Sequence, residues 1–206
     1  MPYFMTTSHK NIPNFAVDEI WEAAWGAKTE VRTKKMHAGL EVGEKYLEKS
    51  GYLTEARKEI PPLFCSQFWY CSEVIKAAIE RLEPKRHQFH PFSLRDQERK
   101  YEVAQLYIIN ILDSIDALDL ERSENLEVYT GYDGQEVVKV NPLFLSKDKR
   151  EIALYQDRIK NRHLWMGPGA FGPAKAFISD ELHDIIKEND ISPSPLRFYR
   201  TKRTLH

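Results

Sequence analysis

A glycine-rich run from Gly167 to Gly172 is the first candidate for chemistry, because glycine loops can hold phosphate groups. Its spacing matches the G-x-G-x-x-G pattern of dinucleotide sites and is similar to the phosphate-binding loop of protein kinases. A dinucleotide site needs a helix that begins at the third glycine, whereas Pro173 follows here and the next helical pattern begins near Ser179. A kinase needs further catalytic residues downstream, for which the sequence leaves too little room. We therefore expect a loop between two strands and no bound nucleotide.

Histidines supply a second candidate, a metal site. His87 and His90 are separated by two residues, and His37, His163 or His183 would have to complete the set. Side chains three positions apart on a strand point to opposite faces, so this pair does not converge on one ion. The sequence also has neither a close cysteine pair with metal-ligand spacing nor an H-E-x-x-H helix. We predict that the protein needs no metal and no other cofactor.

Nucleophiles are the third candidate. Cys71 directly precedes a predicted helix, whose N-terminus can lower the pKa of a thiol. The alternative, inert packing beside Phe68 and Tyr70, is favoured because free cysteine is usually a buried apolar residue. Ser72 and Ser179 stand where a hydroxyl caps the first turn of a helix, so we interpret both as structural N-caps and not as catalytic serines.

Carboxylates form the strongest local pattern in the sequence. Eight acids lie within a stretch that contains a single base, Arg122, and they are Asp113, Asp116, Asp119, Glu121, Glu124, Glu127, Asp133 and Glu136. A solvated face explains such a cluster. Paired acids can also act as general acid and base, as in glycosidases, and an acidic surface can steer a cationic protein partner. The third interpretation makes these eight residues a candidate partner-binding face.

A weak internal repeat of about 30 residues organises the chain around these groups. One copy runs from Phe68 to His90 and the other from Lys175 to Tyr199, and each has the pattern of a strand, a capped amphipathic helix and a second strand. The repeat predicts an α+β fold with one mixed or antiparallel sheet, which both strand-helix-strand units share.

The remaining segments are less uniform. Apolar residues recur at helical spacing from Phe15 to Trp25, so residues 1–60 are predicted to be a mostly helical segment preceding an α+β domain at 61–206. The stretch from Tyr101 to Leu118 fits both a helix and a strand buried on two faces. Residues 126–145 alternate around Gly131 and Gly134, which predicts a hairpin.

Bulk composition narrows the function classes. The net charge is −1 and the pI is about 6.7, so the chain lacks the basic excess typical of nucleic-acid binding proteins. Two cysteines do not make a disulfide scaffold, and no apolar run reaches the roughly 18 residues of a membrane span. The N-terminus shows no secretory pattern. We expect a cytoplasmic protein that binds neither nucleic acid nor a membrane.

The segment from Tyr107 to Asp119, followed by Arg122 and Ser123, resembles the central motif of the bacterial immunity-protein family numbered eleven among polymorphic-toxin immunity families. That motif is a tyrosine-rich apolar run ending in Asn, then Asp-Ala-Ile-Asp and a serine; here the run ends at Asn110, and Asp116-Ala117-Leu118-Asp119 follows. Four flanking segments occur in the family's order: Trp69 to Glu73, Phe89 to Pro91, His163 to Trp165, and Phe177 to Leu182. The resemblance covers roughly residues 60 to 200, and the Gly/Pro-rich loop at 166–173 departs from the family pattern.

The resemblance implies an antidote that binds and neutralises a cognate toxin, delivered between competing bacteria by type VI or contact-dependent secretion. It implies no catalysis and no cofactor. A small enzyme that uses the acidic cluster or the glycine-rich loop is the alternative, and a scaffolding subunit is a third option.

Overall fold

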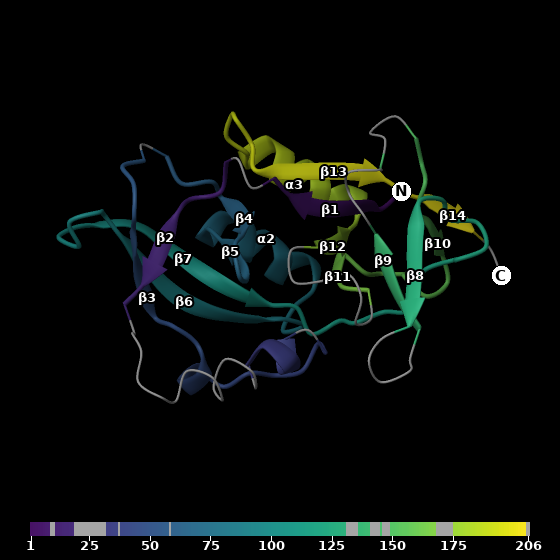
Figure 1. Ribbon diagram of the computed structural model, residues 1–206, viewed down its shortest axis with the longest axis horizontal. Coiled ribbons are helices and arrows are strands. Elements are labelled where there is room, and N and C mark those ends of the chain that lie inside the picture. Colours follow the sequence, from purple (N-terminus) through teal and green to yellow (C-terminus); the bar gives the residue numbers. More distant parts are fainter. Residues whose placement is uncertain are drawn as a thin grey trace.

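The computed structural model describes residues 1–8, 11–18, 32–36, 38–57, 59–130, 136–140, 145, 149–167 and 175–204. These residues form a mixed α+β structure in which strands outnumber helices (Figure 1). Among them, no helix combines the length and apolar character that crossing a bilayer requires.

The largest sheet has six strands. Their spatial order is β2 (Phe15–Val17), β3 (Ser50–Leu53), β6 (Gln88–Arg95), β7 (Glu102–Asn110), β5 (Trp69–Cys71) and β4 (Leu63–Cys65). Neighbouring strands are antiparallel except for β3 and β6, which are parallel. Figure 1 shows that the β6–β7 hairpin reaches one end of the long axis of the molecule, opposite β8 and β9.

A second sheet has four antiparallel strands, in the order β11 (Leu164–Trp165), β12 (Lys175–Ile178), β1 (Tyr3–Thr7) and β13 (Leu196–Arg200). Two small sheets complete the fold. Strands β10 (Ala153–Tyr155) and β14 (Lys202–Thr204) pair in parallel, whereas β8 (Leu126–Thr130) and β9 (Glu136–Val140) form an antiparallel pair. The hairpin predicted for residues 126–145 is thereby confirmed.

The two repeat copies have equivalent topology but lie in different sheets. In the first copy, β5, helix α2 (Glu73–Leu82) and β6 follow one another, and β5 and β6 flank β7. In the second copy, β12, helix α3 (Asp180–Asn189) and β13 follow one another, and the two strands flank β1. The prediction of one shared sheet is therefore wrong. Each copy takes its middle strand from a distant part of the chain, and a local repeat carries no signal for that pairing.

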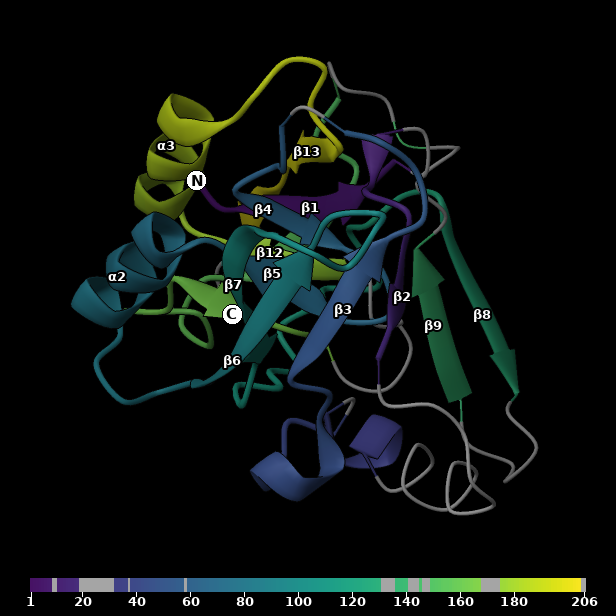
Figure 2. The ribbon, with the colours of Figure 1, turned by 90° about the vertical axis from the view of Figure 1, so that its left-hand side faces the viewer.

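The two helices join the sheets. Ile75, Ala78 and Ile79 form the buried stripe of α2, and Leu182 and Ile186 form that of α3. Ile75 and Ile79 of α2 and Leu182 and Ile186 of α3 share one hydrophobic core with residues of β1, β5, β7 and β12. The helices contact each other and lie side by side in Figure 2. Acidic residues begin each helix and a basic residue lies in its last turn, as the helix dipole favours.

The N-terminal segment contains more strand than helix among its described residues, so the mostly helical segment predicted for residues 1–60 is not confirmed. It supplies β1, β2 and β3, together with a helical turn at 32–36 and the 3-10 turn η2 (Glu44–Tyr46). Phe15 packs edge-on against Tyr70 and Phe92 in the core, so tertiary burial decides its conformation. The rest of the predicted helix, from residue 19 onward, lies outside the described residues.

The ambiguous stretch after Tyr101 is strand β7 as far as Asn110, and its last residues are buried on both faces. The irregular chain that follows is held by Asn110, which is fully buried. Its Nδ2 donates to the backbone oxygen of Leu40 at 2.9 Å and to Oε1 of Gln88 at 2.8 Å. Next to this bond Gly39 adopts a φ of 67°, and a Cβ there would lie 2.6 Å from the backbone oxygen of Leu112. Glycine is required at this close approach.

A buried ion pair anchors the helical turn at 32–36 to the sheet. The guanidinium of Arg32 donates to Oε1 of Glu48, and both side chains are almost fully buried. Arg32 also lies over the ring of Phe68, with 4.6 Å between the guanidinium carbon and the ring centroid. Burying two charges is costly in the absence of such a partner, so each residue depends on the other.

Candidate functional site

The acidic stretch leaves β7 and runs across the surface, where bases from distant parts of the chain contact it. Oδ2 of Asp113 accepts a hydrogen bond from Nε of Arg86 at 2.5 Å and lies 3.6 Å from Nε of Arg162. Asp116 lies 3.7 Å from Nη1 of Arg158. Three cations therefore stand beside the first two acids of the stretch.

The next acids have structural partners as well. Asp119 is 2% exposed, and its Oδ1 accepts a hydrogen bond from the backbone N–H of Arg122 at 3.2 Å. Glu124 lies 3.4 Å from Nζ of Lys202. Glu121 is exposed and has no ion-pair partner among the described residues. The strong charge asymmetry of the sequence is thus largely balanced in space.

Three members of the predicted acidic face cannot be placed in this way. Asp133 lies outside the described residues, and the side chains of Glu127 and Glu136 do as well, although their backbones pair in β8 and β9. The structure therefore brings together Asp113 with Arg86 and Arg162, and leaves Glu121 as an exposed acid without an ion-pair partner among the described residues.

The two serines differ despite their equivalent positions. Ser179 caps α3, since its Oγ accepts a hydrogen bond from the backbone N–H of Leu182 at 3.2 Å. The same hydroxyl lies 2.9 Å from Nδ1 of His163. Ser72 occupies the N-cap position of α2, but its side chain forms no capping bond and has no partner in the described part of the chain. The cap predicted at Ser72 is therefore not formed.

His87 belongs to a buried hydrogen-bond cluster. Its Nε2 lies 3.0 Å from Oε2 of Glu83, which is 5% exposed. Glu83 also accepts hydrogen bonds from the backbone N–H groups of His163 and Leu164, each at 2.9 Å. Burial opposes ionisation of this carboxyl, but these hydrogen bonds outweigh it, so the pKa of Glu83 lies below its usual range. His87 is thus a hydrogen-bond partner of a carboxylate whose role is structural.

The remaining chemical candidates are set in the core or in loops. Cys71 is fully buried, and burial raises the pKa of its thiol well above the usual value, which keeps it un-ionised. Residues 168–174 of the glycine-rich run lie outside the described residues, and the run connects the antiparallel strands β11 and β12. Within the described residues, no three metal-ligating side chains converge.

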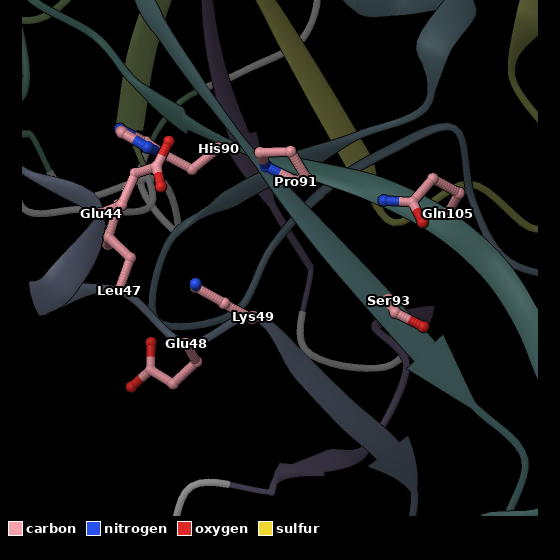
Figure 3. Close-up of a pocket in the computed structure, with 8 residues that line it drawn as sticks. All are labelled: Glu44, Leu47, Glu48, Lys49, His90, Pro91, Ser93 and Gln105. Atoms are coloured by element: carbon pink, nitrogen blue, oxygen red, sulfur yellow. The ribbon is translucent and has the colours of Figure 1, made fainter.

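A recess lies beside β6, where the segment before β3 separates from the sheet (Figure 3). Its volume is about 270 Å³, and it is lined by Glu44, Leu47, Glu48, Lys49, His90, Pro91, Ser93 and Gln105. Figure 3 shows the carboxylate of Glu44 next to the His90 ring and the Lys49 side chain extending toward the side of the recess on which Leu47 and Glu44 lie. Burial lowers the pKa of His90, while the charge of Glu44 opposes this effect. The lowered pKa favours the neutral imidazole, and its buried Nε2 has no partner among the described residues.

A larger recess of about 630 Å³ lies between the start of α3 and the loop before β11. Bases and acids line it in equal number. The bases are Lys160, Arg162 and Arg203, and the acids are Asp157, Asp180 and Glu181. Its contact between His163 and Ser179 is part of the helix cap described above. Sequence analysis identified neither recess, because each is assembled from residues that are distant in the chain.

Exposed apolar side chains gather near the β6–β7 hairpin. Of the five large hydrophobic residues that are exposed in the described part of the chain, Tyr101 (72%) and Val103 (43%) lie at the start of β7, and Val74 (56%) lies on the first turn of α2. Glu73, the neighbour of Val74, hydrogen-bonds the hydroxyl of Tyr107 on the same strand. Such side chains on a projecting hairpin suit protein recognition better than catalysis.

Comparison with known proteins agrees with this view. A family model described as "Immunity protein family (Imm11)" matches residues 14–202. No curated protein sequence matches the chain.

Proposed function

Because the chain belongs to the immunity protein family Imm11, we propose that it binds a cognate toxin protein and blocks that toxin's activity. The observation that carries the proposal is the extent of the family match, which runs from residue 14 to residue 202. It therefore includes strands of both large sheets, both helices and the β6–β7 hairpin.

Action by binding and not by catalysis is part of the proposal. It is supported by the family and by the roles of the candidate nucleophiles, since Ser179 is occupied by its helix cap and Cys71 is buried as a thiol. A binding antidote acts stoichiometrically, whereas an enzyme that destroys the toxin or its product acts at low ratios.

We propose the cytoplasm as the site of the encounter, because an antidote must meet its toxin where the toxin acts. Delivery of that toxin by type VI or contact-dependent secretion belongs to the same proposal. The acidic stretch from Asp113 to Glu136 is proposed as a steering surface for a basic toxin, to which the exposed acids Asp116, Glu121 and Glu124 contribute.

Co-expression with the product of the adjacent gene tests the proposal. We expect rescue of growth, co-purification of the two proteins and complete neutralisation at one antidote per toxin. Rescue without a complex, or neutralisation at a ratio far below one, would show catalysis and overturn the proposal. If the protein neither rescues growth nor forms a complex with that product, the proposed function is wrong as well.

A further inference from the structure

One edge of β7 is uncovered over more than half of the strand. β7 has nine residues, but β5, its neighbour on that side, has three and pairs only with Tyr107, Ile108 and Ile109. Within the described chain, residues 102–106 therefore have β6 on one side and no strand on the other. An open strand edge presents backbone donors and acceptors to another chain.

The hydrogen bonds of β6 show which backbone groups of β7 point toward the open edge. The N–H of Ser93 in β6 donates to the backbone oxygen of Lys49 at 2.9 Å, which is away from β7. Ser93 and Gln105 are opposite each other in the antiparallel ladder, so they form a pair whose backbone groups both point outward. The N–H and C=O of Gln105 therefore face the open edge, and Gln105 is exposed.

The corresponding edge of β6 differs in this respect. β6 pairs with β3 only from Ser93 onward, and before that point it runs through Pro91, which has no N–H to offer and which lines the recess of Figure 3. Strand addition is therefore blocked at that stretch of β6 and open at β7.

We propose that the open edge of β7 binds an extended segment of the toxin as an added strand; this inference rests on the proposed function. Backbone hydrogen bonds to Gln105 hold the segment, as in other cases of strand addition. The exposed side chains of Tyr101, Val103 and Val74 lie beside the edge and contact the segment's side chains. Tyrosine in particular contributes large contact area at protein interfaces.

Charge identifies the occupant as a basic segment. At one end of the edge, Glu102 is exposed and forms no ion pair within the described residues. At the other end, Lys76 is shared between Glu73 and Glu80, at 3.2 and 3.3 Å, so one negative charge is left uncompensated. Hydrogen bonds from Tyr107 and Lys76 outweigh desolvation and hold the pKa of Glu73 below its usual value, so this acid is ionised at neutral pH.

These charges also disfavour a second copy of the chain as the occupant. Antiparallel pairing of two β7 edges would bring Glu102 of one copy toward the Glu73 end of the other, and like charges opposite each other destabilise a strand pair. A toxin segment that carries Lys or Arg at both ends of an apolar run complements the same edge.

The test compares Gln105→Pro with Gln105→Ala in complex with the product of the adjacent gene. Both variants lose the side chain, but only proline removes the N–H that faces the open edge, and this N–H makes no bond to β6. We expect Gln105→Pro to weaken binding about tenfold or more, the loss expected for a backbone hydrogen bond left unmade at an interface. We expect Gln105→Ala to stay within about threefold of the wild type.

Amide hydrogen exchange on the unaltered protein provides a second measurement that no folding defect can confuse. In the free protein the N–H of Gln105 should exchange fast and that of Leu106, which faces β6, slowly; in the complex both should be protected. If a complex forms but Gln105 still exchanges fast and Gln105→Pro binds normally, the strand addition is wrong while the proposed function stands. If the free protein is a dimer with Gln105 already protected, a second copy occupies the edge and the inference is wrong. If the wild type forms no complex, both proposals fail.

Discussion

The carboxylate of Glu83 accepts a 2.9 Å hydrogen bond from the backbone N–H of Leu164, 81 positions later in the chain. Glu83 follows the last residue of α2 in the first repeat copy, and Leu164 begins β11 in the sheet of the second copy. One buried side chain thus ties the two copies together in addition to their shared hydrophobic core.

Replacing Glu83 with Gln should destabilise the protein at pH 7 by about 2 to 3 kcal/mol. The backbone N–H groups of His163 and Leu164 bond different oxygens of Glu83, so the amide oxygen serves one of them while its NH2 group faces the other, and an unpaired buried donor carries a penalty of this size. Urea unfolding at pH 7 measures the loss. Glu80→Gln, on the exposed side of the same helix, is the matched control and should change stability by less than about 0.5 kcal/mol.

The pH dependence of this loss follows from the lowered pKa of Glu83. A carboxyl whose folded pKa lies below its unfolded value contributes stability that is complete above the ordinary glutamate pKa of about 4.3. That contribution disappears as the pH falls through the folded pKa. The difference between the wild type and Glu83→Gln should therefore shrink toward pH 3, and a constant difference would show that Glu83 is not ionised at pH 7.

The serines at the two helix starts should behave differently. Ser179→Ala should cost about 1 kcal/mol, because the cap to Leu182 is lost. Ser72→Ala should cost less than about 0.5 kcal/mol, because no capping bond exists to be lost. Urea unfolding of both variants, with toxin binding measured in parallel, checks this. A binding defect in Ser179→Ala without a change in stability would indicate a functional serine instead.

The buried pair of Arg32 and Glu48 predicts strong non-additivity. Glu48→Ala alone should cost about 3 to 5 kcal/mol, since it leaves a buried guanidinium without its partner. Exchanging both residues together, Arg32→Met with Glu48→Leu, should restore most of this loss, because the desolvation cost of both charges is removed. A double-mutant cycle in urea unfolding gives the coupling, and additive losses would contradict it.

Charge reversal tests the acidic stretch as a steering surface. Glu121→Lys combined with Glu124→Lys should slow association with the toxin and weaken its dependence on ionic strength. Glu188→Lys, an exposed acid on α3 outside both the stretch and the β6–β7 hairpin, is the control. Stopped-flow association at two salt concentrations measures the effect. Equal rates for all three proteins would show that the bases found beside Asp113, Asp116 and Glu124 cancel any steering.

Local patterns in the sequence were sufficient for the elements whose partners are close in the chain. The hairpin of β8 and β9 and the amphipathic helix α3 with its Ser179 cap both follow from residues within one short window. Strands β2 and β3 were missed because packing of Phe15 against Tyr70 and Phe92, not helical spacing, determines the local conformation. The single shared sheet was wrong for a similar reason, since β1 and β7 enter the repeat copies from outside.

The candidate site shows the same limit. The excess of acids between Asp113 and Glu136 is a property of the linear sequence, and the structure brings Arg86, Arg158, Arg162 and Lys202 to it from remote positions. The open edge of β7 has no sequence signature, because it depends on how short β5 is relative to β7.

The central position of β1 in its sheet affects when a newly made chain can protect a cell. Phe4 in β1 lies opposite Phe177 in β12 and Tyr199 in β13, and the hydroxyl of Thr201 donates to the backbone oxygen of Pro2 across 199 positions. β1 therefore leaves the ribosome well before β12 and β13, and it cannot pair with them until these later strands have been made. At about 5 to 20 residues per second, that delay is on the order of 10 to 40 seconds. During this interval a newly made chain has no complete second sheet, so under the proposed function only molecules completed before the toxin arrives can neutralise it.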